Sequence, residues 1–183
     1  MLSVKSSLSI NMEKGLIHIY TGGGKGKTTA AVGLCVRCCN HGYKVGFTSF
    51  LKDFESGEVL GDCPFTILRI PPFKGFWSDL EEKEKEAVRQ ELNTSLCDVF
   101  RTAEEERYDL IVLDEVLVAA SLGAVDTNLL AEKLTNKPSR LEVVMTGAMC
   151  PSELLEYADY ISEIKCVKHP YEKGIQARKG IEK

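Results

Sequence analysis

Short apolar runs alternate with longer segments of helical periodicity along most of the chain. The apolar runs, which predict strands, cover residues 16–20, 45–50, 65–70, 110–113, 141–145 and 160–164. Apolar residues at helical spacing predict a helix directly after residue 29 and a long helix, with one buried stripe, over residues 79–107. Pro151 is suited to the first turn of a further helix.

The order of these elements predicts the fold class. Nearly continuous apolar strands separated by helices indicate an α/β fold of three layers, in which a mostly parallel sheet carries helices on both faces. In such a sheet, ligands bind at the carboxyl ends of the strands. The 183 residues suit one domain, which we place at residues 14–183. The Ser-rich residues 1–13 are predicted to form a flexible N-terminal arm or a segment that becomes ordered on a partner.

Composition narrows the function classes. A net charge of −4 without a long Lys/Arg run argues against nucleic acid as a partner. The mixed charges at residues 81–86 are typical of a solvated helix face. No segment has the length and apolar character of a signal peptide core or a membrane span, so we expect a cytoplasmic protein without a membrane partner.

Seven cysteines form no disulfide framework, which fits a reducing compartment. Cys35, Cys38 and Cys39 share one predicted helix face, so one hypothesis is that they bind a metal. Small core residues are the better interpretation, because no second Cys or His pair is available to complete a zinc site.

The strongest chemical signal is the glycine-rich stretch at residues 21–29, between the first strand and the first helix. Backbone amides can converge on phosphate oxygens only where no Cβ intrudes, and a helix N-terminus adds to the attraction for anions. The stretch follows the phosphate-loop pattern G-x-x-x-x-G-K-[ST], with Thr21 in place of the first glycine. The alternative is a glycine-rich turn without a ligand. We predict a nucleoside triphosphate site made by Gly22, Gly23, Gly24, Lys25, Gly26, Lys27, Thr28 and Thr29.

Two acids follow the apolar strand at residues 110–113. Asp114 and Glu115 have the form of a Walker B segment, which holds Mg²⁺ directly or through water, and the Thr28 hydroxyl is suited to the same ion. Alternatively, Asp114 caps a helix that begins there. The predicted Mg²⁺ ligands are therefore Thr28, Asp114 and Glu115.

Five stretches taken together resemble the ATP:corrinoid adenosyltransferase family of the cob(I)yrinic acid a,c-diamide type. They are residues 21–31, 50–52, 113–115, 141–147 and 167–182. The resemblance runs from about Gly15 to Glu182, and Lys25 and the His169-Pro170 tail make it specific, because neither is a general feature of phosphate-loop proteins.

The resemblance implies an activity. A corrinoid reduced to Co(I) attacks the 5′ carbon of ATP, the 5′-deoxyadenosyl group is transferred, and triphosphate leaves. ATP lies across the loop in reversed direction, with Lys27, Thr28 and Glu115 in catalytic roles and with Mg²⁺ as cofactor. The family also implies a flavin-containing electron donor and a homodimer.

The chain departs from the family in several places. The family uses a Phe and a Trp with one residue between them on the corrinoid, whereas Phe76 and Trp77 are adjacent here. They are the predicted corrinoid contacts, and a hydrophobic lid over the sheet edge is the alternative. Leu117, Val118 and Ala148 replace polar residues of the family. A carrier or sensor that binds ATP and corrinoid without turnover, or another phosphate-loop ATPase or kinase, therefore remains an alternative.

Overall fold

The computed structural model describes residues 13–52, 61–68 and 70–181. The predicted N-terminal arm, residues 1–13, lies outside the described residues except for its last residue. Among the described residues, none of the helices is long and apolar enough to cross a membrane.

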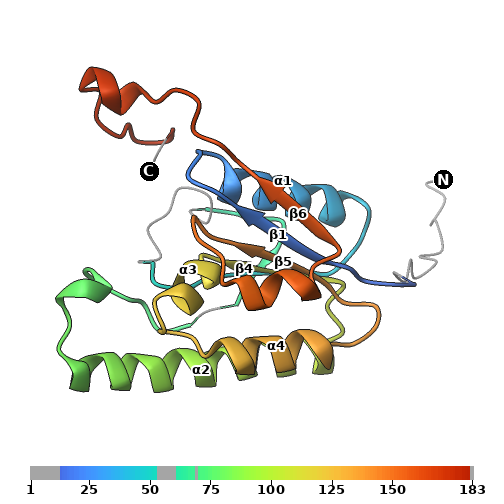
Figure 1. The fold of residues 1–183 in the computed structure, drawn as a ribbon. Coiled ribbons are helices and arrows are strands. Elements are labelled where there is room, and N and C mark those ends of the chain that lie inside the picture. The colour runs from blue at the N-terminus through green and yellow to red at the C-terminus, as the bar shows by residue number, and fades with distance from the viewer. Residues whose placement is uncertain (1–12, 53–60, 69, 182–183) are drawn as a thin grey trace, which may run out of the picture.

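The centre of the fold is a six-stranded sheet in the order β3-β2-β4-β5-β1-β6 (Figure 1). All of its strand pairs are parallel, which confirms the predicted sheet. The strands are β1 (Ile17–Thr21), β2 (Val45–Ser49), β3 (Thr66–Ile67), β4 (Leu110–Asp114), β5 (Glu142–Thr146) and β6 (Tyr160–Glu163).

The strand predicted at residues 65–70 is much shorter than expected. Only Thr66–Ile67 is a strand, and the amide of Leu68 makes one more bond to β2, 2.8 Å from the carbonyl of Phe47. Among the described residues, β3 lies at the sheet edge and pairs with β2 alone. Pro71 and Pro72 follow and cannot donate to a ladder, so the pairing ends early.

Helices cover both faces of the sheet, as predicted (Figure 1). α1 (Lys27–Asn40) lies on one face, whereas α2 (Glu82–Glu105), α3 (Val116–Ser121) and α4 (Thr127–Thr135) lie on the other. Three short 3₁₀ turns complete the described elements: η2 (Trp77–Asp79), η3 (Ser152–Tyr157) and η4 (Pro170–Lys173). The helix expected near Pro151 is therefore a 3₁₀ segment, with Pro151 at its N-cap.

The long predicted helix starts a little later than expected. Residues 77–79 form η2, and α2 begins after Glu81, which exchanges capping bonds with Glu84. An ion pair of 3.0 Å joins Lys85 to Glu82 one turn earlier, and Glu82 is largely exposed. The charge-rich segment is thus the solvated helix face that its pattern predicted.

Two apolar layers hold the sheet between its helices. On the α1 side, Cys35 and Cys38 pack with Phe47, Val112 and Val144, which confirms their interpretation as core residues. Burial raises the pKa of the Cys35 thiol to about 12, so it stays protonated and unreactive. On the other side the stripe of α2 packs on β4 through the buried residues Leu92, Leu96, Val99, Ile111 and Leu113. The layers fix both faces of β4, the strand that ends in Asp114.

Candidate active site at the carboxyl ends of the strands

The glycine-rich loop connects the end of β1 to the start of α1, at the carboxyl edge of the sheet. Gly22 and Gly26 have φ angles of 100° and 117°, in the left-handed region that side chains disfavour. Gly26 is the N-cap residue of α1. The free amides at the helix start therefore face the loop, which suits the binding of an anion.

The loop also packs against the chain that leaves β6. The amide of Gly24 donates to the carbonyl of Ile164 at 2.7 Å. A Cβ atom added to Gly22 would lie 2.5 Å from the Ile164 carbonyl oxygen, and one added to Gly24 would lie 2.7 Å from it. A Cβ added to Gly23 or Gly26 would meet no atom of the described residues within 4 Å. The sequence interpretation assigned all four glycines to phosphate approach. The structure shows that Gly22 and Gly24 are also needed for a close chain contact.

Lys27, the first residue of α1, bends back over the loop. Its ammonium donates to the carbonyl oxygens of Gly22 at 2.7 Å and Gly24 at 2.8 Å. These bonds hold a positive charge in the concave side of the loop. An anionic oxygen that enters the loop can take over this donor group, because a charged acceptor binds an ammonium more strongly than a carbonyl does.

Asp114 is the centre of the polar cluster. It is fully buried at the end of β4. Its Oδ1 accepts from the hydroxyls of Thr28 at 2.9 Å and Thr146 at 2.6 Å. Its Oδ2 accepts from the ammonium of Lys52 at 2.7 Å and the hydroxyl of Ser49 at 3.5 Å. The alternative role of Asp114 as a helix cap is wrong, because α3 begins at Val116 with Glu115 at its N-cap.

Glu115 has a left-handed backbone with φ of 58°, which costs a residue with a side chain on the order of 1 kcal/mol. A bond of 2.9 Å from its amide to the Thr146 hydroxyl holds this conformation. Burial raises the pKa of the Glu115 carboxyl and the Asp114 charge raises it further, whereas Lys52 and Lys27 act against the rise. Strained and partly buried acids of this kind are typical of functional sites.

The structure thus brings Lys27, Thr28, Asp114 and Glu115 into one cluster, as the sequence predicted. It adds three residues that the sequence analysis did not assign: Ser49, Lys52 and Thr146. Lys52 and Thr146 lie in two of the stretches that carry the family resemblance, and each follows or ends a strand. The hydroxyl and carboxylate oxygens of the cluster are of the kind that Mg²⁺ prefers.

The two predicted corrinoid contacts have different surroundings. Trp77 is half-buried and packs against the apolar layer under α2. Phe76 is 74% exposed. Their segment is tied to the polar cluster by a bond of 3.4 Å from the amide of Phe73 to the carbonyl of Lys52.

The departures from the family also differ in position. Leu117 is fully buried in the layer under α2. A Cβ added to Gly147 would lie 2.7 Å from the Cβ of Leu117, so Leu117 packs against the end of β5. Ala148 and Met149 are exposed beyond that end. The replacement at Leu117 is therefore a packing feature, whereas Ala148 and Met149 change the surface.

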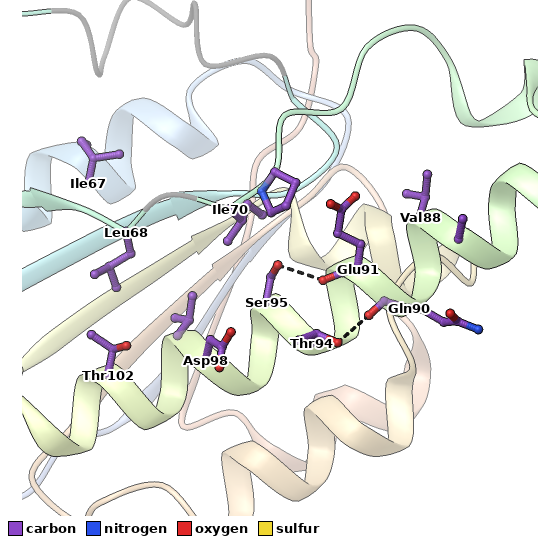
Figure 2. Close-up of a pocket in the computed structure, with 13 residues that line it drawn as sticks. Ile67, Leu68, Ile70, Val88, Gln90, Glu91, Thr94, Ser95, Asp98 and Thr102 are labelled. Carbon is purple, nitrogen blue, oxygen red and sulfur yellow. Dashed lines mark hydrogen bonds between the residues drawn. The ribbon is translucent and has the colours of Figure 1, made fainter.

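A separate groove of about 990 Å³ runs between α2 and a wall that includes Ile67, Leu68, Ile70 and Pro71 (Figure 2). None of the predicted site residues lines it. The hydroxyls of Thr94 and Ser95 each donate at 2.8 Å to a carbonyl of their own helix. These two hydroxyls are therefore engaged within α2.

Comparison with known proteins agrees with this geometry. The model of the family described as ATP:corrinoid adenosyltransferase BtuR/CobO/CobP matches residues 13–182. A corrinoid adenosyltransferase of Escherichia coli K12 is 32% identical over 93% of this chain and 86% of its own length. The corrinoid adenosyltransferase CobA of Salmonella typhimurium is 31% identical over the same shares. A corrinoid adenosyltransferase of Pseudomonas aeruginosa is 28% identical over 93% of this chain and 84% of its own length.

Proposed function

The chain belongs to the ATP:corrinoid adenosyltransferase family, and we propose that it transfers the 5′-deoxyadenosyl group of ATP to Co(I) of a corrinoid and releases triphosphate. The observation that carries the proposal is the phosphate-type loop joined through Thr28 to the buried Asp114. Co(I) of the substrate is the nucleophile, so no side chain has to act as a base. The new bond joins cobalt to the 5′ carbon, and the electron pair of the broken C–O bond leaves with the triphosphate.

The loop would then serve the leaving group. Negative charge develops on the ester oxygen of an intact triphosphate, and donors aimed at that charge lower the barrier. The ammonium of Lys27 and the amides of the loop other than that of Gly24, which is bonded to Ile164, would be such donors. Lys27 would exchange its bonds to the loop carbonyls for bonds to phosphate oxygens. ATP would lie in reversed direction, which presents the 5′ carbon rather than the γ-phosphorus to the corrinoid.

We propose Thr28, Asp114 and Glu115 as the residues that hold Mg²⁺. Their oxygens form a hard donor set, and the contact of 2.9 Å between Thr28 and Asp114 shows that two members already converge. When bound, Mg²⁺ supplies positive charge to the triphosphate. The residues themselves would place that charge beside the loop, because Thr28 lies in α1, Asp114 ends β4 and Glu115 is the N-cap of α3.

The corrinoid would contact Phe76 and Trp77. The exposure of Phe76 supports this, because a large apolar side chain in water is available to a ligand. Trp77 would anchor the segment through its packing on the core, and Phe76 would contact the corrinoid.

A homodimer and a flavin-containing electron donor are further parts of the proposal. β6 is exposed at the sheet edge, and the tail beyond it extends away from the sheet (Figure 1). Tyr160, Ile161 and Val167 there are 52%, 51% and 93% exposed. A second copy would cover such an apolar edge. Cys35, Cys38, Cys39, Cys97, Cys150 and Cys166 form no disulfide, which supports a cytoplasmic location.

One experiment separates the candidate activities. The full-length protein is incubated with ATP, Mg²⁺ and a chemically reduced corrinoid, and phosphorus NMR follows the products. The proposal expects intact triphosphate together with the absorption spectrum of an alkyl-cobalt corrinoid. ADP with inorganic phosphate would indicate an ATPase instead, and ADP with a phosphorylated acceptor would indicate a kinase. Binding of both substrates without any product would indicate a carrier or sensor, the alternative favoured by the changed surface at Ala148.

A further inference from the structure

Lys52 reaches the polar cluster through an unusual turn. β2 ends at Ser49, Phe50 is fully buried, and Leu51 has a left-handed φ of 51°. The amide of Phe50 donates to the carbonyl of Asp114 at 2.8 Å. A leucine rarely adopts such a backbone, and the strain is tolerated because the surroundings hold it. The turn brings the side chain of Lys52 to the carboxyl end of β4.

The Lys52 ammonium lies among the oxygens that the proposed function assigns to Mg²⁺. It is 2.7 Å from Oδ2 of Asp114, 3.5 Å from the Thr28 hydroxyl and 3.8 Å from Oε1 of Glu115. In the described part of the chain, no other side chain makes a hydrogen bond or ion pair with all three residues. The side chain of Lys52 is 29% exposed, so it has room to move.

We propose that Lys52 is a positioning residue that acts as the internal cation of this site and yields its place on Asp114 to the divalent cation that accompanies the triphosphate. The proposal rests on the proposed function, because it uses the same three ligands. Two neighbouring carboxylates repel each other, and the ammonium offsets that repulsion while it holds Asp114 and Glu115 in place. A cation bound about 2.1 Å from the same carboxylate would lie too close to an ammonium. The two cations therefore compete.

The backbone of Lys52 is held in place by its neighbours, so only the Lys52 side chain moves in the exchange. The carbonyl of Lys52 accepts a bond from the amide of Phe73, and the turn before it is tied to β4 through Phe50. The flexible side chain can swing toward solvent, where its ammonium is free to meet the triphosphate. A purely structural ion pair would not change its partner when a divalent cation is added.

Titration of the full-length protein with Mn²⁺, followed by the electron paramagnetic resonance signal of free Mn²⁺, tests the exchange. Lys52→Met removes the competing charge and is expected to bind Mn²⁺ at least about fivefold more tightly than the natural protein. Lys52→Arg keeps the charge and is expected to stay close to the natural affinity. Lys44→Met is the matched control, because Lys44 forms an ion pair of 2.8 Å with Glu106, and both partners are largely exposed. Unchanged or weaker binding by Lys52→Met would overturn the proposal.

Two further measurements keep the outcomes separate. Asp114→Asn should abolish Mn²⁺ binding. If the natural protein binds no Mn²⁺, or if Asp114→Asn still binds it, the proposed metal site is wrong and the proposed exchange is wrong with it.

If Lys52→Met does not fold, carbon NMR of the natural protein replaces that variant. The protein is labelled at the lysine ε-carbons, and the Lys52 signal is assigned as the one that is lost in Lys52→Arg. Addition of Mg²⁺ should shift the Lys52 signal and leave that of Lys44 in place. A Lys52 signal unmoved by saturating Mg²⁺ would contradict the exchange while leaving the metal site intact.

Discussion

The triphosphate half of the site and its aromatic half are held by the fold in different ways. Asp114 is fully buried and bonded to residues from α1, from β5 and from the turn after β2. Phe76, in contrast, is 74% exposed on a connection between β3 and α2. The first half is anchored in the interior of the protein through Asp114, so changes to its buried residues affect binding and stability together. The second half lies on an exposed connection, so it can change its ligand contacts without unfolding the protein.

The largest effect is expected at the triphosphate half. Lys27→Ala removes the ammonium from the loop and should lower adenosyl transfer by about 100-fold or more, because it removes a donor to the leaving group. The rate of triphosphate release measures the loss. Lys83→Ala, an exposed position of α2, is the control. Nearly full turnover by Lys27→Ala would show that this half of the site is not catalytic.

Two neighbouring glycines test how tightly this half is built into the fold. Gly24→Ala should lower the free energy of unfolding by about 1–3 kcal/mol, because the new methyl group would press on the carbonyl of Ile164. Gly23→Ala has space and should change stability by less than about 0.5 kcal/mol. Denaturant unfolding compares the two variants, and equal losses would mean that the contact with Ile164 is not important.

The partly buried carboxyl of Glu115 lowers the stability of the folded protein at neutral pH, where it is ionised. Its pKa is raised by burial above the ordinary value of 4.5, so the folded protein binds this proton more tightly than the unfolded chain does. The stability that protonated Glu115 contributes is present at low pH and is lost as the pH rises through the raised pKa. Glu115→Gln should therefore have a higher Tm than the natural protein at pH 7, and the gain should disappear below pH 4.5. A gain that is equal at both pH values would show that charge is not the cause.

The smallest effects on the fold are expected in the aromatic half. Phe76→Ala should change the free energy of unfolding by less than about 0.5 kcal/mol, because its side chain is exposed. It should nevertheless raise the KM for the corrinoid and leave ATP affinity unchanged. Trp77→Ala should cost about 1–2 kcal/mol of stability, because the indole packs on the core. Steady-state kinetics and denaturant unfolding check both, and a corrinoid KM unaffected by either change would remove the aromatic half from the site.

Several elements could be predicted because their signals are local. The apolar run before the glycines predicted β1, and the run that ends in Asp114 predicted β4. α4 was missed, and α3 was considered only as the helix that Asp114 would cap. Four of the six residues of α3 are buried, so it has no polar face to show a helical period. α4 had a usable signal, since Asp126 caps it by accepting from the amides of Asn128 and Leu129.

By itself, the sequence determined the chemistry of the site. It supplies glycines where the chain must turn left-handed or approach another segment, and a lysine and a threonine at a helix start. It also supplies two acids at the end of a buried strand. Only the tertiary structure decided which side chains meet there. Lys52 and Thr146 are 62 and 32 residues away from Asp114 in the chain. They reach it because β2 and β5 both pair with β4, an order that differs from the order of the strands along the chain. Such pairing depends on packing between distant segments, which no local pattern of residues encodes.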